Sequence, residues 1–413
     1  MTGEDRHVLW LAGVSWDGIP GADRQMVTGL TRHARIFYVD PPISPATRAR
    51  SRNGSVRLFR PRLQVISERL TRLTPVVLPG LSRPVVRNTT AAILRGQVKS
   101  TLARQGIKPS VVVSTCLEDL LGHFGSGVLN VLYGTDNYVG GAELMGLSVT
   151  RQRKQERRAL SQADKIICVT PPLAARWTDL GASPQVVLPG CVLTDLAGRP
   201  VAAGLPDLPR PVVGLIGQLS DRLDMDALES IADSGYSMLI VGPVDSRWTD
   251  PRFKNLTDRG NVHYVGPVRP DEVPGYLAAI DIGITPYRDI PFNRTAWPLK
   301  TMEYLGAGVP TVTSAMPTAV GLHDELAGIV GAAAADQILA LADDGAEFVK
   351  AVSRVAAAVA AEDDEAEADA GTTANAGNTA DARPPLSRQA IAFAGRHTWA
   401  ARADEFAAAI GLT

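Results

Sequence analysis

The chain has 413 residues, of which 45% are apolar and 21% are charged, and its 42 Lys and Arg nearly balance 43 Asp and Glu. This composition excludes a disordered or collagen-like chain and gives no global sign of nucleic-acid binding, while the length suits two domains of roughly 150–200 residues each. The three cysteines, Cys116, Cys168 and Cys191, are widely spaced with no CxxC motif. This spacing argues against a disulfide framework or a zinc site and fits a reducing, cytoplasmic compartment. Because the chain begins without a basic segment and a long apolar one, and has no run of 18 apolar residues, we expect neither a signal peptide nor a membrane span.

The first half of the chain alternates short apolar runs with stretches of helical pattern. The runs that predict buried strands are 7–14, 35–40, 110–115, 128–134, 164–170 and 185–190. Helices are expected between several of them, over 88–105 and 146–162. Apolar strands separated by helices are typical of a parallel sheet with helices on both faces.

A Gly- and Pro-rich stretch over 195–210 predicts a linker, after which the same pattern starts again. The second set of apolar runs is 211–217, 237–243, 261–267, 281–287 and 310–315. We therefore expect an α/β chain with two parallel-sheet domains, 1–200 and 201–360.

The last part of the chain changes in composition. Residues 331–361 are rich in alanine and are expected to be helical, whereas 361–385 is acidic and then rich in Gly, Thr and Asn, which predicts a disordered insert. Residues 386–413 predict a C-terminal helix, anchored by Trp399 and Phe406 and returning to the first domain.

The segment 293–311 has the strongest chemical signal. Pro298 suits the first position of a helix, Gly306 and Gly308 end it, and Lys300 and Glu303 fall on one face. A cation in the first turn of a helix, where the free N–H groups already attract anions, suits a phosphate, and a carboxylate one turn on suits a ribose diol. Taken alone, a solvated Lys–Glu pair on a surface helix is the commoner arrangement.

The sequence PLKTMEYLGAGVPTV resembles the PxKxxEYLAxGxPVV segment of the large "group 1" family of retaining GT-B glycosyltransferases. The resemblance extends to VVGLIGQLSDRLDMDALESI and to VHYVGPVRPDEVPGYLAAIDIGITPY. It implies two Rossmann-like domains facing a cleft, with the second domain holding a nucleotide-sugar. The donor-binding residues that it implies are Gly217, Arg222, Val268, Lys300 and Glu303.

Some of these positions have ordinary alternatives. Arg222 follows a loop that differs from the usual family pattern, and its alternative is a surface ion pair with Asp221 or Asp224. Val268 is as well explained as a core residue. The family's first glutamate falls at Thr295, which puts the full catalytic picture in question. Since the sequence shows no convincing DxD motif, we expect no metal and no cofactor other than the nucleotide-diphosphate sugar used as a substrate.

The first domain resembles the acceptor half of the same enzymes, especially a branch acting on cell-envelope polysaccharides. Asp136, in YGTDNY, is the candidate acid near the reacting sugar or the acceptor hydroxyl; an equally common role is to cap the following turn. Gly13, Ser15 and Trp16 follow the first strand, where α/β folds place ligand loops. For Gly13, an ordinary turn is the alternative to the approach of a phosphate.

The segment 48–104 contains thirteen Lys and Arg and one acid, Glu68, among apolar residues. This pattern suggests contact with an anionic membrane surface, which suits a lipid-pyrophosphate acceptor. The alternative is a solvated arginine-rich face. We find no nucleic-acid motif.

The sequence thus predicts a metal-independent, retaining glycosyltransferase with Asp136, Arg222 and Lys300 as catalytic residues. Its expected partners are a nucleotide-sugar donor and a glycan, lipid-linked or small-molecule acceptor, in the cytoplasm or at the inner face of the membrane. A nucleotide-sugar 2-epimerase, which needs catalytic acids and a histidine, and a non-catalytic nucleotide-sugar-binding subunit stay open as alternatives.

Overall fold

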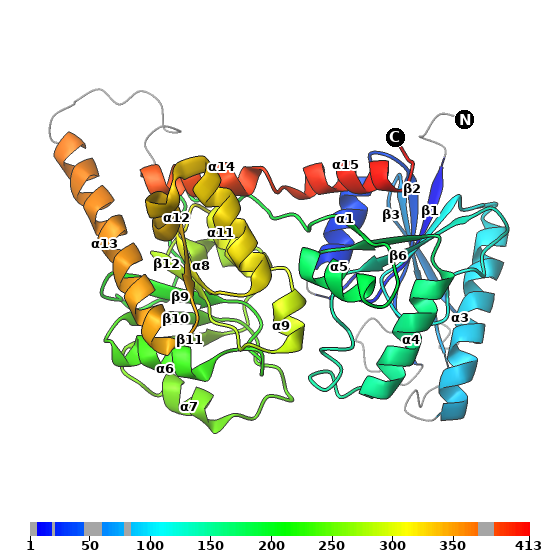
Figure 1. Ribbon diagram of the computed structural model, residues 1–413, viewed down its shortest axis with the longest axis horizontal. Coiled ribbons are helices and arrows are strands. Elements are labelled where there is room, and N and C mark those ends of the chain that lie inside the picture. Colours follow the sequence, from blue (N-terminus) through cyan, green and yellow to red (C-terminus); the bar gives the residue numbers. More distant parts are fainter. Residues whose placement is uncertain (1–5, 19–20, 45–59, 78–83, 371–383) are drawn as a thin grey trace. The chain divides into compact units, whose positions relative to one another are not determined.

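The computed structural model describes residues 6–18, 21–44, 60–77, 84–370 and 384–413, and it contains two α/β units (Figure 1). Unit 1 comprises Met1–Gly190 together with Trp399–Thr413, and unit 2 comprises Cys191–Thr398. Within the described ranges, no helix combines the length and the apolar character needed to cross a membrane.

Unit 1 is built on one eight-stranded sheet in the order β3-β4-β2-β1-β5-β6-β7-β8. All neighbouring strands are parallel except β3 and β4, which pair antiparallel at one edge. The central strands are buried along nearly their whole length, as expected when helices cover both faces of a parallel sheet. The strands are β1 (His7–Leu11), β2 (Arg35–Val39), β3 (Arg62–Ser67), β4 (Leu70–Thr74), β5 (Val111–Ser114), β6 (Leu129–Gly134), β7 (Lys165–Cys168) and β8 (Gln185–Val186).

The C-terminal helix of the chain completes the core of unit 1. Phe406 is fully buried, with its ring centroid 5.8 Å from that of Trp10 and 4.9 Å from that of Tyr133. Gly29 permits the close packing of α15 on α1, since a Cβ at Gly29 would lie 2.5 Å from the Cβ of Ala403. The helices of this unit are α1 (Ala22–Leu30), α3 (Pro84–Arg104), α4 (Val149–Gln162), α5 (Pro171–Thr178) and α15 (Trp399–Ala409).

Unit 2 contains a six-stranded, fully parallel sheet in the order β11-β10-β9-β12-β13-β14. Its strands are β9 (Val212–Ile216), β10 (Ser237–Val241), β11 (Val262–Gly266), β12 (Ile282–Thr285), β13 (Thr311–Ser314) and β14 (Leu339–Ala342). Its helices are α6 (Met225–Asp233), α7 (Pro251–Thr257), α8 (Val273–Leu277), α9 (Pro291–Thr295), α10 (Leu299–Gly306), α11 (Pro317–Val330), α12 (Ala332–Ile338), α13 (Gly345–Ala370) and α14 (Pro385–Gly395).

Every strand predicted from an apolar run is present, but three further strands were not predicted. β3 and β4 form the hairpin at the edge of the unit 1 sheet, where β3 is largely exposed and therefore lacks a continuous apolar run. β14 lies inside the alanine-rich segment 331–361, which was expected to be helical throughout. Its four residues pair in parallel with β13, so tertiary pairing overrides their helix propensity.

Three domain boundaries differ from those predicted. The units divide at Gly190 rather than at residue 200, because the linker is bound to unit 2, where the N–H groups of Thr194 and Ala202 donate to the carbonyls of Gly306 and Gly275. Of the predicted insert 361–385, residues 361–370 continue α13, since Ala and Glu favour helix; 371–383 lie outside the described residues. The predicted C-terminal helix over 386–413 is two helices, α14 in unit 2 and α15 in unit 1.

Candidate active site

The first candidate site lies where α10 begins, in unit 2. Pro298 is the residue before the helix, so Lys300 falls in its first turn and Glu303 one turn later. The Lys300 Nζ donates to Glu303 Oε2 at 2.6 Å, with 35% and 30% of the two side chains exposed. The pair is therefore formed as the spacing predicts, and solvent reaches both charged groups.

The main chain at the end of β9 packs directly against this pair. A Cβ on Gly217 would lie 3.3 Å from the Lys300 Cε, so the glycine lets the lysine stem cross the strand end. The Tyr304 hydroxyl accepts the Ile216 N–H at 2.6 Å and thereby fixes α10 to β9. Gly242, with φ +142, contacts the main chain of Gly217, and a Cβ on Gly242 would lie 1.8 Å from the Gly217 carbonyl oxygen. These contacts hold Gly217 and Lys300 together at the carboxyl end of the sheet.

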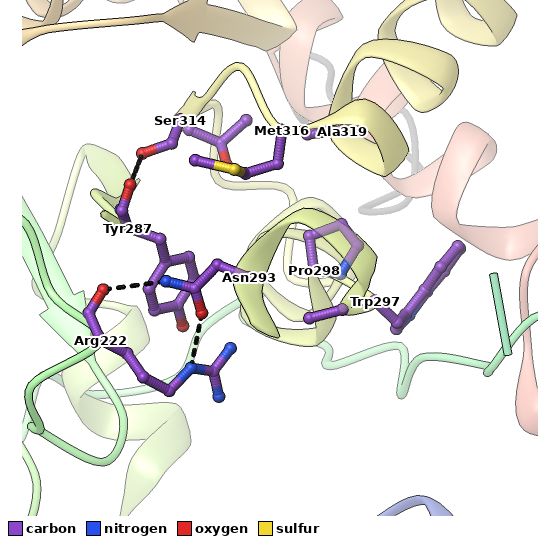
Figure 2. A pocket seen from close by; sticks show the side chains of 10 residues that line it. Arg222, Tyr287, Asn293, Trp297, Pro298, Ser314, Met316 and Ala319 are labelled. Atoms are coloured by element: carbon purple, nitrogen blue, oxygen red, sulfur yellow. Dashed lines mark hydrogen bonds between the residues drawn. The ribbon is translucent and has the colours of Figure 1, made fainter. Parts of the chain in front are cut away.

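Arg222 supplies a second cation in this unit. Its Nε–H donates to Asn293 Oδ1 at 2.8 Å, and its guanidinium lies over the rings of Phe292 and Tyr287, 4.7 and 5.0 Å from their centroids. Figure 2 shows hydrogen bonds that join Asn293 to the Nε and to the main-chain carbonyl of Arg222, and none drawn from its two terminal nitrogens. Among the described residues no carboxylate forms an ion pair with this guanidinium, which leaves it able to bind an anion.

The alternative partners considered for Arg222 are used elsewhere. Asp221 pairs with Arg288 at 2.9 Å, and Asp224 caps α6 by accepting the N–H groups of Asp226 and Ala227. The interpretation of Arg222 as a surface ion-pair residue bound to Asp221 or Asp224 is therefore wrong.

A pocket within unit 2 opens between Arg222 and the start of α10 (Figure 2). Its lining residues come from the loops after β9 and β12, from the 293–298 segment, from the end of β13 and from the start of α11: Arg222, Tyr287, Asn293, Ala296, Trp297, Pro298, Thr313, Ser314, Met316 and Ala319. The Trp297 Nε1–H is buried and donates to no described residue. The pocket thus combines a cation, aromatic surface and hydroxyl groups.

Two other predicted positions of unit 2 have simpler surroundings. The buried Thr295 directs its hydroxyl at the carbonyls of Pro291 and Phe292 in its own helix, 3.2 and 3.1 Å away. Val268 is half-buried and packs on the apolar cluster that includes Ile216. Its contacts are those of a core residue at the edge of the sheet.

The candidate residues of unit 1 meet at the carboxyl ends of β1, β5 and β6. The Gly13 N–H donates to Thr115 Oγ1 at 2.8 Å and lies 3.3 Å from Asp23 Oδ2. A Cβ on Gly13 would be 2.9 Å from the Thr115 carbonyl oxygen, so the glycine is needed for this approach. The N–H that was considered for a phosphate is bound to the protein's own side chains.

Asp136 lies in the loop after β6, close to the same network. The Tyr138 hydroxyl donates to the Thr115 carbonyl at 2.9 Å and would lie 3.4 Å from a Cβ on Gly13. The turn that follows is capped by Asn137, whose Oδ1 accepts the Gly140 N–H. Gly13 and Asp136 are therefore brought to one end of the sheet.

Ser15 and Trp16 differ in their exposure. Ser15 is exposed, whereas Trp16 is 8% exposed and packs edge-to-face on Tyr38. The main-chain N–H of Trp16 donates to Asp40 Oδ1, and the guanidinium of Arg24 lies over the indole ring of Trp16. Trp16 is thus buried at the base of the loop, whereas Ser15 is accessible.

Sequence reasoning missed Asp23, a buried acid in the first turn of α1. Its Oδ2 accepts the Thr115 hydroxyl at 2.7 Å, and its Oδ1 is buried with no partner among the described residues. The pKa of this carboxyl is raised to about 6, mainly by burial and to a smaller extent by the charge of Asp136, while the hydrogen bonds from Thr115 and Gly13 act in the opposite direction. An aspartate at the start of a helix reads in sequence as an ordinary capping residue, and only its burial distinguishes it.

The basic segment 48–104 is only partly described, because 48–59 and 78–83 lie outside the described residues. Arg72 in this segment is buried and bound to Asp40 and Asp17 at 2.6 and 2.8 Å, and Arg95 pairs with Asp119. The interpretation of the whole run as surface charge is wrong for these two arginines.

The chain contains two sheet units, each with polar loops at the carboxyl ends of its strands. Comparison with solved structures identifies the fold. Sucrose-phosphate synthase from Thermosynechococcus elongatus aligns over 98% of both chains with a TM-score of 0.66 and 16% identity. Anabaena HepE in complex with UDP-glucose aligns over 98% of this chain and 100% of that chain, with a TM-score of 0.61 and 14% identity. The chain has the GT-B fold.

A likeness to a known family is found in the second unit. A family model described as "Glycosyl transferases group 1" matches residues 210–358, so this segment of unit 2 is similar to the group 1 glycosyltransferases. A Bacillus subtilis relative named "Putative teichuronic acid biosynthesis glycosyltransferase TuaH" is 39% identical over 109 residues, which are 26% of this chain. That match spans about a quarter of the relative, or 27% of its length.

Proposed function

We propose that this protein is a glycosyltransferase that moves a sugar from a nucleotide-diphosphate donor to a glycan, glycolipid or small-molecule acceptor. The observation that carries the proposal is the presence of two cations in unit 2, one packed against the main chain at the end of β9 and one in the loop that follows β9. Lys300 lies in the first turn of α10 against Gly217, and Arg222 projects a guanidinium that no described carboxylate neutralises. A diphosphate is the anion that two cations and a helix N-terminus suit best.

In this proposal the catalytic work is electrostatic. Lys300, Arg222 and the N–H groups at the start of α10 stabilise the negative charge that develops on the departing nucleotide diphosphate. Glu303, now bound to Lys300, accepts the ribose hydroxyls when the donor binds, and the Lys300 ammonium turns to the phosphates. Gly217 admits the phosphates close to the main chain, and Val268 borders the base.

Two finer features belong to the same proposal. The resemblance of 293–311 to retaining enzymes supports transfer with retention of the anomeric configuration. The charge of Arg222 and Lys300 supports departure of the diphosphate without a metal ion, and no cofactor besides the donor is proposed.

The acceptor side is assigned to unit 1, with Asp136 near the reacting hydroxyl and Gly13, Ser15 and Trp16 in the bordering loop. The partial match to a relative named for teichuronic acid biosynthesis supports a cell-envelope polysaccharide or its lipid-linked precursor as acceptor. With such an acceptor, the enzyme would act in the cytoplasm, at the inner face of the membrane.

The test is a panel of UDP-, GDP- and dTDP-sugars, with release of nucleotide diphosphate measured with and without acceptors. Turnover of one donor, lowered at least 100-fold by Lys300→Ala and by Glu303→Ala, is expected. The matched control is Lys254→Ala, which removes an exposed lysine of α7 from its ion pair with Asp258. This variant is expected to leave turnover unchanged. Full turnover in the Lys300 and Glu303 variants refutes the proposal.

A second candidate, a non-catalytic subunit that binds a nucleotide-sugar, is favoured by Thr295. Its hydroxyl faces its own helix where the family has a glutamate. Micromolar nucleotide-sugar binding with no turnover on any acceptor is the outcome that selects this candidate.

A 2-epimerase receives less support. Of the histidines considered for it, His123 contacts Asp119 in unit 1, His323 contacts Asp336, and His263 lies on β11. Interconversion of donor 2-epimers without transfer selects it.

A further inference from the structure

The outward face of α4 is a dense cationic surface that the proposed function does not use. It carries Arg151, Arg153, Lys154, Arg157 and Arg158, which together we name the α4 surface. At 100° per residue these five side chains fall within roughly 160° of the helix circumference, on the side away from the buried residues Glu156 and Ala159. In Figure 1, α4 lies at the periphery of its unit.

Neighbouring acids leave most of this charge unbalanced. In the described part of the chain, Arg158 alone of the five forms an ion pair, at 2.7 Å from Asp119, which Arg95 shares. The acid of the helix itself, Glu156, is 2% exposed and holds the Arg176 guanidinium with both oxygens at 2.6 and 2.7 Å. The other four cations of the α4 surface therefore form no ion pair within the described residues.

Apolar side chains adjoin the α4 surface at the N-terminal end of the helix. Leu147 is 45% exposed, and Leu144, Met145 and Val149 are half-buried beside it in sequence. Cations next to exposed aliphatic side chains match the interface of a bilayer, where anionic headgroups lie just above the acyl chains. Residues 144–162 contain no aromatic side chain on which nucleic-acid bases would stack, which favours lipid over nucleic acid.

We propose that the α4 surface, together with Leu147, docks unit 1 on an anionic lipid bilayer. The cations bind the headgroups, and Leu147 enters the boundary with the acyl chains. The chain segment from Asp136 to Leu147 links the candidate acceptor residue to the docked surface within one loop. A lipid-anchored acceptor would therefore bind near Asp136. This consequence rests on the proposed function, whereas the docking of unit 1 on the bilayer does not.

The experiment measures co-sedimentation of the full-length protein with vesicles, in the absence of any sugar donor. Vesicles of phosphatidylcholine with 30% phosphatidylglycerol are compared with pure phosphatidylcholine, at about 0.1 M and 0.5 M salt. Binding is expected only to the anionic vesicles and is expected to weaken at the higher salt. Because each cation contributes about 1 kcal/mol near such a surface, a variant with Arg153→Gln, Lys154→Gln and Arg157→Gln should bind about 100-fold more weakly. Leu147→Ser should lower binding about fivefold.

The matched control removes three exposed cations from unit 2, as Arg247→Gln, Lys254→Gln and Arg269→Gln. It has the same net charge as the α4 variant and should bind vesicles like the unmodified protein. Equal loss in both variants overturns the proposal, as does equal binding of the α4 variant and the unmodified protein. A single-stranded RNA 20-mer is tested in parallel. Binding to the RNA through the α4 surface without binding to the vesicles also overturns it. Since no donor is present, these results are independent of any failure of the transferase assay.

Discussion

The substitution Asp23→Asn is expected to remove a pH dependence from the stability of unit 1. The Asp23 carboxyl is 4% exposed, and burial raises its pKa to about 6 from an ordinary value of 3.8. The asparagine side chain retains the shape of the aspartate and an oxygen to accept the bonds from Thr115 and Gly13, but it cannot ionise. The perturbation therefore isolates the cost of the buried charge.

The size of the effect follows from linkage. Because the folded state holds the proton more tightly than the unfolded state, the protonated acid is stabilising below pH 3.8, and this stabilisation is lost as the pH rises to 6. A shift of about two pKa units corresponds to about 3 kcal/mol in total. Between pH 5 and pH 7.5 the expected loss is roughly 1–2 kcal/mol. The free energy of unfolding of Asp23→Asn, relative to the unmodified protein, should rise by that amount over this interval.

The assay is urea unfolding followed by tryptophan fluorescence, since four of the six tryptophans belong to unit 1. Both proteins are measured at pH 5 and pH 7.5, so that the titration of all other groups cancels in the difference. Asp136→Asn serves as a second test, because removing that charge should lower the pKa of Asp23 and shrink the pH dependence. A difference between Asp23→Asn and the unmodified protein that is the same at both pH values refutes the assignment of a buried, easily protonated acid.

Other substitutions test separate contacts. Gly242→Ala should lower the free energy of unfolding of unit 2 by at least about 2 kcal/mol, because its Cβ would overlap the Gly217 carbonyl; a thermal melt unchanged from the parent contradicts this. Glu156→Gln should cost about 3 kcal/mol in urea unfolding, since it leaves a partly buried guanidinium unpaired, and a cost below about 1 kcal/mol would argue against a structural pair. Arg222→Lys should weaken nucleotide binding in calorimetry about tenfold, because an ammonium cannot present the planar fork of donors that the guanidinium, positioned by Asn293 and Phe292, offers to a phosphate; equal affinity would exclude a role in binding phosphate.

The strands could be predicted because they are buried on both faces and appear as continuous apolar runs, as in β9 and β10. The edge strand β3 has no such signal because most of its residues are exposed. The break between α14 and α15 was equally invisible, since an amphipathic pattern continues across Arg396–Thr398 while the two helices belong to different units. Edge position and unit membership are properties of the tertiary arrangement rather than of local pattern.

Some contacts of the candidate site could likewise be predicted from the sequence, and others could not. The Lys300–Glu303 contact follows from the helical spacing of three residues, which sequence shows directly. The partner of Arg222 was not foreseeable, because Asn293 lies 71 positions away and the nearby acids looked equally suitable. Asp23 escaped notice for a related reason: its partner Thr115 is 92 positions away, and burial was the only property that set it apart. The roles of these residues in catalysis stay predictions.

The position of Phe406 in the core of unit 1 has a consequence for how the protein is made. Unit 1 contains the strand β1, yet the ring that fills the space beside Trp10 and Tyr133 comes from α15, which follows the whole of unit 2 in the sequence. A nascent chain that ends at Gly190 has every strand of the first sheet and an apolar gap where α15 belongs. Unit 2 can therefore close during synthesis before unit 1 is complete, and a truncation that removes α15 damages the unit that was translated first.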